Sequence, residues 1–347
     1  MLTRARFVPA GLVAILVACS PASPPASSGG PTSSTGTQPT AAGQTQTIRL
    51  AVSQTDSNFY SPIFIAQKEG FYKEQGIELD VKPVNPPTAT QALIANQFDI
   101  AHAASPGISA ALQGAPVKMI FVIAERAPYW VITRPDIKTW TDLKGKKLGV
   151  SSTTGTQVLD TTRLLKLHGV DAAADGVQYV VPGGPGDADK YAGLKSGTID
   201  AGLFSGLGGV QALGDGYNQI GDFSEINTLD YTIWTTDSFI QSKPALVQGF
   251  VTATLKGLQI YKQHPERALS ATTEQFENDQ AAAKKLMDMS ASWFDDDGII
   301  SDAALEEGVR YKREAAEKPS DVTGAQMIKM DFARQANDEL KKTNFKP

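Results

Sequence analysis

The chain has 347 residues with 32 basic and 37 acidic side chains, which give a formal charge of −5 at neutral pH. No basic run interrupts this acidic balance, which argues against a nucleic-acid partner. A single cysteine excludes an internal disulfide, and the residue spacings typical of metal sites, serine hydrolases or redox cysteine pairs are absent, so we expect no catalytic residues, no metal and no cofactor.

The N-terminus predicts export. Arg4 and Arg6 precede an uncharged apolar stretch over residues 7–18, which is shorter than the roughly 20 residues that span a bilayer. This pattern is typical of a signal peptide, which we assign to residues 1–18. Residues 16–19 (Leu-Val-Ala-Cys) resemble the lipobox of bacterial lipoproteins, a resemblance that implies lipidation of Cys19 and loss of the preceding peptide.

A low-complexity segment follows the lipobox. From Cys19, residues 19–46 carry Ser, Pro, Gly, Thr, Ala and Gln without charge or large apolar side chains. Such a composition cannot bury a core, and we expect a disordered tether. The predicted location is extracytoplasmic, in a periplasm or at a cell surface, with lipid anchoring to a membrane.

The body alternates between two periodicities in chain order. Short apolar or alternating runs predict strands, and capped segments with helical spacing lie between them. Alternation of this kind indicates α/β units with parallel strands. The predicted strands cover residues 48–52, 77–81, 98–103, 117–124, 129–133, 147–150, 178–182, 200–204 and 231–235, and the predicted helices lie at 61–70, 88–97, 105–114, 156–169, 187–196 and beyond 244.

Two lobes account for this order of elements. We assign residues 47–127 and 236–347 to the first lobe, and residues 128–235, crossovers included, to the second. In this arrangement the C-terminal helices lie on the first lobe. We expect the chain to be a monomer.

Three segments resemble one known family. Residues 61–79, 142–150 and 194–201 resemble the corresponding segments of the nitrate/sulfonate/taurine-type ABC substrate-binding proteins, a group that includes binders of thiamine-precursor pyrimidines. The resemblance implies a type II periplasmic-binding-protein fold, with two crossover hinge segments and a ligand held between the lobes. It also implies two partners, an ABC permease and its ATPase subunits.

Four loops are predicted to face the ligand: 53–60, 103–106, 151–156 and 183–187. Several are rich in Ser, Thr and Gly and lead into helix N-termini, where free N–H groups and the helix dipole favour an anion. Aromatic side chains nearby would suit an aromatic or heterocyclic ligand instead. The predicted ligand-binding residues are Asp56, Asn58, Phe59, Tyr60, Ser105, Trp130, Ser152, Thr153, Thr154, Gly155, Thr156, Phe204, Ser205 and Asp230.

The chain departs from the sulfonate-binding pattern after the strand at 200–204. Those relatives tend to carry a bulky aromatic residue, an acid and a proline there, whereas this chain has Ser-Gly-Leu-Gly-Gly over residues 205–209. The glycines predict a roomier pocket that need not take a sulfonate.

An enzyme on the same fold, acting on a small aromatic or pyrimidine-like substrate, is the alternative. Relatives that synthesise the thiamine pyrimidine rely on a cysteine-rich segment, which is missing here because Cys19 is the only cysteine. His102 lies near a predicted cleft loop, but one histidine makes neither a catalytic dyad nor a metal site. The sequence therefore favours a binding protein, and it does not identify the ligand.

Overall fold

The computed structural model describes residues 45–53, 58–153, 156–226, 228–273, 279–314 and 320–347. Cys19 and residues 20–44 of the predicted tether fall outside these ranges, as do three predicted site residues, Asp56, Thr154 and Gly155; the side chain of Thr156 is also not described. The predicted end of the tether at residue 46 is too late, because Gln46 pairs in strand β1. The described residues form an α/β structure with two five-stranded sheets.

The first sheet has the strand order β2-β1-β3-β10-β4. Strand β1 pairs in parallel with β2 and with the central strand β3, whereas β10 runs antiparallel between β3 and β4. The strands are β1 (Gln46–Val52), β2 (Ile77–Pro83), β3 (Ile100–His102), β4 (Val117–Ala124) and β10 (Tyr231–Thr236).

The second sheet repeats this topology in the order β7-β6-β8-β5-β9. Here β6 pairs in parallel with β7 and β8, and β5 runs antiparallel between β8 and β9. The strands are β5 (Trp130–Thr133), β6 (Lys147–Gly149), β7 (Gln178–Val180), β8 (Ala201–Phe204) and β9 (Asn218–Asp222). Each sheet thus holds one antiparallel strand, β10 or β5, next to the segment through which the chain passes from one sheet to the other.

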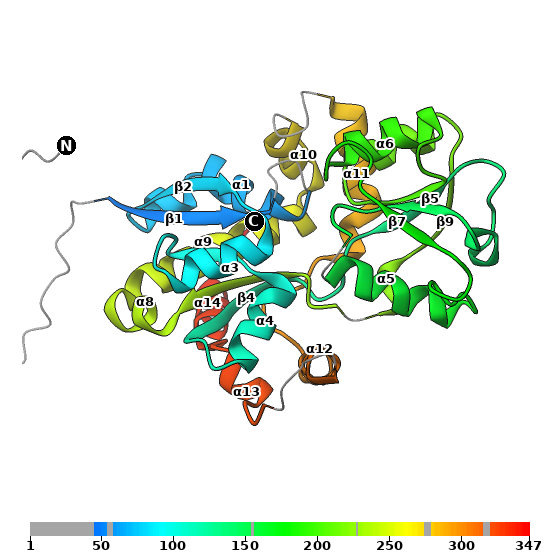
Figure 1. Cartoon of the computed structure of the whole chain (residues 1–347). Helices are drawn as coiled ribbons and strands as arrows, with labels where there is room; N and C mark the ends of the chain where they lie inside the picture. The colour runs from blue at the N-terminus through cyan, green and yellow to red at the C-terminus, as the bar shows by residue number, and fades with distance from the viewer. Residues whose placement is uncertain (1–44, 54–57, 154–155, 227, 274–278, 315–319) are drawn as a thin grey trace, which may run out of the picture. The chain divides into compact units, whose positions relative to one another are not determined.

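Helices connect and cover these strands (Figure 1). Their bounds are α1 (Ser61–Lys68), α2 (Phe71–Glu74), α3 (Pro86–Ile94), α4 (Ala104–Leu112), α5 (Thr156–Leu167), α6 (Asp187–Ser196), α7 (Leu207–Gly214), α8 (Asp237–Ser242), α9 (Pro244–Gln263), α10 (Pro265–Thr273), α11 (Gln280–Ser290), α12 (Asp302–Glu314), α13 (Gly324–Met327) and α14 (Asp331–Lys342). Short 3₁₀ turns include η1 (Asn58–Tyr60), η2 (Trp140–Leu143), η3 (Phe223–Glu225) and η5 (Ala291–Trp293).

The predicted alternation of strands and helices is confirmed, with shifts at several ends. Helix α3 starts at Pro86 because Asn85 caps it, its Oδ1 accepting the Thr88 N–H at 3.1 Å. The sequence analysis did not identify α7 or β9. Glycine-rich segments weaken helix patterns, and three of the eight residues of α7 are glycines.

The division of the chain into two lobes stays a prediction. Strand β10 (Tyr231–Thr236) belongs to the first sheet, although residues up to 235 were assigned to the second lobe with its crossovers. The return from the second sheet is therefore complete before Tyr231.

Helix α11 differs from the expectation that the C-terminal helices lie on the first lobe. Its residues Ala283 and Leu286 are buried with Trp130, Ile132 and Phe204 of the second sheet. The helices α9 and α14, in contrast, contribute to the core of the first sheet. The apolar faces of the C-terminal segment thus complete the cores of both sheets.

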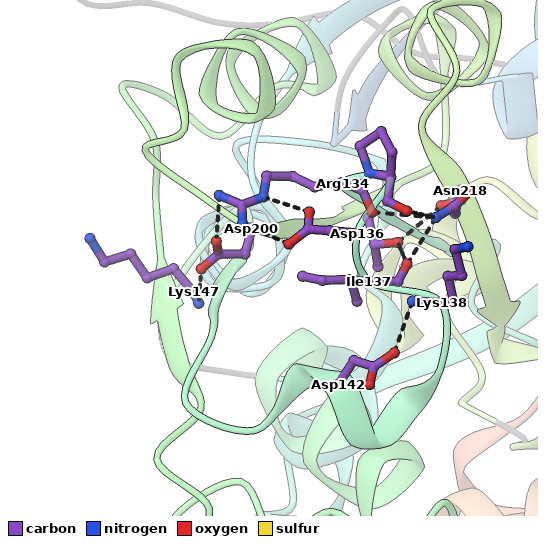
Figure 2. Close-up of polar contacts among 10 residues, drawn as sticks. Arg134, Asp136, Ile137, Lys138, Asp142, Lys147, Asp200 and Asn218 are labelled. Atoms are coloured by element: carbon purple, nitrogen blue, oxygen red, sulfur yellow. Dashed lines mark hydrogen bonds and ion pairs between the residues drawn. The ribbon is translucent and has the colours of Figure 1, made fainter.

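A polar cluster fastens one end of the second sheet (Figure 2). Arg134 follows β5 and forms ion pairs with Asp136 at 3.1 Å and Asp200 at 3.0 Å. Asp200 also accepts the main-chain N–H of Lys147 at 2.9 Å, and Asn218 Nδ2 donates to the carbonyl of Ile137 at 2.9 Å. Because this cluster holds the amino ends of β6 and β8, the opposite edge, where parallel strands end, remains for a ligand.

Helices α1 and α9 approach so closely that one contact requires glycine. A Cβ added to Gly257 in α9 would overlap the carbonyl oxygen of Pro62 in α1, which is main chain and has little room to move. The absence of a side chain at Gly257 is therefore what allows the two helices to cross at this distance.

We expect Gly257→Ala to lower the free energy of unfolding by about 1–3 kcal/mol, the usual cost of overpacking a core. The measurement is urea unfolding followed by circular dichroism. Gly214→Ala at the end of α7 is the matched control, because an added Cβ there meets nothing within 4 Å and alanine favours helix. Equal stability of the two variants would contradict the close approach of α1 and α9.

Candidate functional site

A hydrogen-bonded chain starts where β1 and β3 end. The Tyr60 hydroxyl lies 2.6 Å from His102 Nδ1, and His102 Nε2 lies 2.7 Å from the main-chain carbonyl of Asp230. A carbonyl only accepts, so Nε2 carries the proton and Nδ1 accepts from Tyr60. The Tyr60 oxygen in turn accepts the Ser53 N–H at 3.0 Å. Burial lowers the pKa of His102 to about 4, which keeps the ring neutral and fixes this tautomer.

The predicted residues preceding Tyr60 are parts of the core. Asn58 is fully buried, and its Nδ2 donates to the hydroxyls of Tyr261 and Ser290 at 2.6 and 2.5 Å. Phe59 stacks on Phe294 with ring centroids 4.7 Å apart. Both side chains fasten η1 to the C-terminal helices, so their contribution to a ligand site is indirect.

Three charged side chains that interact electrostatically form the candidate site, and we call them the central cluster: Asp160 of α5, Asp230 before β10, and Lys312 of α12. Asp160 is 3% exposed and Lys312 is 8% exposed. Among the described residues none of the three charged groups makes a hydrogen bond or an ion pair, although each shifts the pKa of a neighbour.

Desolvation dominates the electrostatics of the central cluster. Burial raises the pKa of Asp160 to about 7 and that of Asp230 to about 6, while the nearby Lys312 ammonium opposes both shifts. Burial also lowers the pKa of Lys312. The three groups are thus close enough to interact electrostatically and too far apart to pair.

Two tyrosines and an amide border the central cluster. Burial raises the pKa of Tyr129 well above its usual value, and the Asp230 carboxylate adds to that shift. The Gln157 side chain lies close enough to Tyr129 to lower this pKa, yet its Nε2 is buried without a partner at hydrogen-bond distance among the described atoms. Tyr311 of α12 has a pKa raised to about 12 by burial and by Asp160. Hydroxyl, amide and carboxyl groups from both sheets and from α12 therefore converge here.

Helix α12 is joined to α5 beside the central cluster. An ion pair links Arg163 of α5 to Glu307 of α12, and the Arg163 guanidinium also lies 5.4 Å from the ring centroid of Tyr311. These contacts position Lys312 opposite Asp160.

The predicted polar loop of the second sheet is only partly directed inward. Ser151 donates to the carbonyl of Pro185 at 2.8 Å, and its N–H is accepted by Gln157 Oε1 at 2.7 Å. The side chains of Ser152 and Thr153 are exposed. Ser105 is buried in the first turn of α4, with its hydroxyl 3.5 Å from the Thr228 carbonyl.

A carboxylate of the chain itself occupies the helix N-terminus at Ser205. Asp187 Oδ2 accepts the main-chain N–H groups of Ser205 at 3.0 Å and Gly206 at 2.6 Å. Its second oxygen lies 2.8 Å from the Lys190 ammonium, and both side chains are buried. The position that would suit a ligand anion at the start of α7 is therefore filled by Asp187.

The glycines after β8 do not make room, contrary to the sequence-based expectation. A Cβ on Gly209 would lie 2.8 Å from the Cβ of Phe204, and one on Gly208 would overlap the main chain of Asp187. Phe204 and Trp130 are buried in the core of the second sheet. The glycines allow α7 to pack tightly on α6 and β8, which removes space instead of creating it.

The sequence analysis named Tyr60 and Asp230, which lie in this region, and it did not name Asp160, Lys312, Tyr129 or Gln157; the ligand-binding role of each residue stays a prediction. Asp160 and Gln157 are one helical turn apart on α5, directly after the predicted loop 151–156. That spacing was a usable signal. Lys312 offered none, because it lies in a charged helix far along the chain.

Most of the first sheet and the whole second sheet lie in a segment that matches a family model. Residues 58–268 match the family described as NMT1/THI5 like, which is more than half of the chain. The chain belongs to the NMT1/THI5-like family.

Relatives of this NMT1/THI5-like chain include binding proteins. The riboflavin-binding protein RibY of Chloroflexus aurantiacus is 25% identical over 272 residues, covering 76% of this chain and 75% of its own. The aliphatic sulphonate binding protein SsuA of Escherichia coli has the same fold, with a TM-score of 0.64 at 16% identity over 84% of this chain and 99% of its own. The predicted periplasmic-binding-protein fold is thereby confirmed.

An enzyme is also similar to the chain. The desulfurization enzyme DSZB matches with a TM-score of 0.64 at 16% identity, over 84% of this chain and 99% of its own. The fold alone therefore does not distinguish a binding protein from an enzyme. That distinction depends on the side chains of the site.

Neither a metal site nor a membrane-spanning helix occurs among the described residues. In those parts of the chain no set of three or more His, Cys, Asp and Glu side chains is arranged to hold a metal ion. Over the same residues no helix is both long and apolar enough to span a membrane.

The raised pKa of Asp160 implies that the free energy of unfolding depends on pH. A folded-state pKa of about 7, against about 3.9 in an unfolded chain, means that the folded protein binds more protons between these values. The free energy of unfolding therefore falls as the pH rises through this window. Asp160→Asn removes this titration, and we expect the variant to match the parent near pH 4 and to exceed it at pH 8 by up to about 4 kcal/mol, at about 1.4 kcal/mol per unit of pKa difference.

Urea unfolding of both proteins at pH 4, 6 and 8 measures this difference. Asp338→Asn, at an exposed position on α14, is the control for removing an acid at the surface. A constant difference between parent and Asp160→Asn across the three pH values would contradict the desolvated state of Asp160.

Proposed function

We propose that the chain is the extracytoplasmic solute-binding component of an ABC importer, and that the solute binds at the central cluster. The observation that carries the proposal is the convergence there of charged groups from both sheets and from α12 that lack partners among the described residues. Burying unpaired charges costs free energy, and a bound solute that pairs with them would recover part of that cost. The family match and the fold that the chain shares with SsuA support its assignment to the solute-binding proteins.

Capture in this class of fold involves hinged closure of two lobes around the ligand. A solute stabilises the closed form only if it binds that form better than the open one. Contacts in this structure that closure would create or tighten include the Arg163–Glu307 ion pair and the Trp130–Trp293 ring contact, whose centroids lie 5.6 Å apart. The closed form would then deliver the solute to a permease driven by an ATPase.

One observation favours catalysis as the second candidate. A carboxyl with a pKa of about 7, such as Asp160, is suited to general acid–base chemistry. His102 does not extend this machinery, because both its nitrogens are engaged by Tyr60 and the Asp230 carbonyl. Asp160 as the acid or base of an enzyme, acting on a small aromatic or pyrimidine-like substrate, therefore remains the alternative.

Tryptophan fluorescence, to which the contacting Trp130 and Trp293 contribute, tests binding against turnover. We expect a saturable change in emission when the purified protein is titrated with its solute, since the ring contact reports on the segments that closure brings together. Mass spectrometry after overnight incubation should recover the solute unchanged. Steady conversion of the solute by the parent, abolished in Asp160→Asn, would replace the binding function with the enzymatic one.

We also propose that Cys19 carries the lipid anchor and that the residues between Cys19 and β1 tether the body to a membrane. The support is the lipobox-like sequence before Cys19 and the uncharged, small-residue composition after it. Attachment by acyl chains needs more than one chain for stable anchoring, and a lipidated N-terminal cysteine would provide several.

Labelling with radioactive palmitate in a bacterial host tests the anchor. We expect the parent chain to incorporate label and to sediment with membranes, and Cys19→Ser to lose both properties while remaining folded. Equal sedimentation of the two proteins would contradict anchoring through Cys19.

A further inference from the structure

The chain passes between the two sheets twice, and the two connecting segments are joined beside Leu229. The first segment leaves β4 at Ala124, and the second enters the first sheet at Tyr231, where β10 starts. The main-chain carbonyl of Glu125 accepts the N–H groups of Thr228 at 3.3 Å and Leu229 at 2.7 Å. A change in the backbone at this junction would therefore alter how the second sheet is oriented on the first.

Leu229 has a backbone conformation that a leucine disfavours. Its φ is +51°, in the left-handed region, and its side chain is fully buried. The other described non-glycine residues with positive φ are Asn96, Ala104 and Asn344. Asparagine tolerates this region, whereas a bulky side chain there is strained and persists only where its surroundings hold it. Leu229 is therefore a point of local strain between the two sheets.

Helix α12 and Glu125 hold Leu229 in this conformation. The Leu229 side chain lies against Gly308 of α12, and a Cβ at Gly308 would overlap it. The start of α12 is in turn fixed to the first connecting segment, because Glu125 Oε1 accepts the N–H of Ser301 at 2.6 Å. The strained residue is thus enclosed by the other connecting segment and by a helix that follows both sheets in the sequence.

The contact between α12 and α5 accompanies this strain. Glu307, the residue before Gly308, pairs with Arg163 of α5. Arg163 Nη1 and the Thr228 hydroxyl are buried without a hydrogen-bond partner among the described atoms. Buried polar atoms without partners cost free energy. The arrangement in which α5 meets α12 therefore carries local costs at the junction of the connecting segments and at the helix contact.

We propose that Leu229 is a strained hinge residue that favours opening of the ligand-free protein. The left-handed conformation belongs to the closed form, meaning the form in which α5 lies against α12. When no solute is bound, Leu229 returns to a negative φ and the second sheet turns away from α12. The inference rests on the proposed solute-binding function for the purpose of this movement. A solute that prefers the closed form has to offset the strain, so empty and loaded molecules differ in shape.

Leu229→Gly and Leu229→Ala separate backbone strain from side-chain packing. Both variants lose the contact with Gly308, whereas only glycine adopts a positive φ without steric cost. We expect the ratio of closed to open molecules, without solute, to be at least about fivefold higher in Leu229→Gly than in Leu229→Ala. Two folded forms are compared, so the greater freedom of glycine in the unfolded chain does not affect this ratio.

Pulsed electron–electron double resonance on the purified full chain measures the ratio. Spin labels are attached at Gln113→Cys, after α4, and Lys166→Cys, in α5, both exposed positions, with Cys19→Ser removing the native thiol. The closed form gives the shorter distance between the labels. Asn96→Gly is the control, because Asn96 has a φ of +57° outside the connecting segments. Its ratio should stay within about twofold of the parent, as expected for a site without coupling to the hinge.

Gly308→Ala tests the same device from the side of the helix. The added methyl group would overlap the Leu229 side chain in the closed form, so we expect at least about a threefold lower ratio of closed to open molecules. In the Leu229→Ala background the space is free, and the same substitution should change the ratio by less than about twofold. This variant keeps the inference testable if circular dichroism shows that neither Leu229 variant folds.

Two results would overturn the inference. Equal ratios in Leu229→Gly and Leu229→Ala would mean that the strain at Leu229 does not differ between the two forms. A single distance that neither the Leu229 variants nor Gly308→Ala change would mean that this junction does not control opening. None of these measurements requires a solute, so failure of the tryptophan titration would reject the proposed function without deciding the role of Leu229.

Discussion

The position of β10 is the constraint on which the rest of this structure depends. Strand β10 lies between β3 and β4, so β4 joins the first sheet only through a segment that the chain reaches after building the whole second sheet. The first sheet cannot be completed until residue 236 is in place. The same insertion brings Asp230, just before β10, to the ends of β1 and β3, where its main-chain carbonyl accepts from His102. The position of β10 therefore determines both the strand order of the first sheet and the location of Asp230 in the candidate site.

The charges at the centre are possible because other contacts hold the surrounding segments. Asn58, Tyr261 and Ser290 form a buried hydrogen-bonded group that fixes η1 to α9 and α11. Tyr60 is then oriented by Ser53 and His102. With these side chains held, Asp160, Asp230 and Lys312 stay near one another without closing into ion pairs, an arrangement that favours function over stability.

The sequence allowed prediction of the fold because its signals are local. Strand runs such as 48–52 and 117–124, and the proline in the first turn of the helix that starts at Ser61, report their own secondary structure. The three segments that resemble a known family then fixed the topology. The site was harder to predict, since Asp160 and Lys312 are 152 positions apart and meet only through tertiary packing. The expectation that the glycines after Ser205 make room was wrong for a related reason: tertiary packing brings the main chain of Asp187 and the side chain of Phe204 into the space beside Gly208 and Gly209.

The carboxylate of Asp187 has a consequence for how such sites diverge. It stands where two main-chain N–H groups and a buried ammonium would otherwise receive an external anion. The Asp187 carboxylate thus makes the contacts that a bound anion would make. Whether this position accepts an anion therefore depends on one side chain and not on the arrangement of strands and helices. A lineage could exchange one kind of cargo for another by replacing a single residue, without rebuilding a strand or a helix.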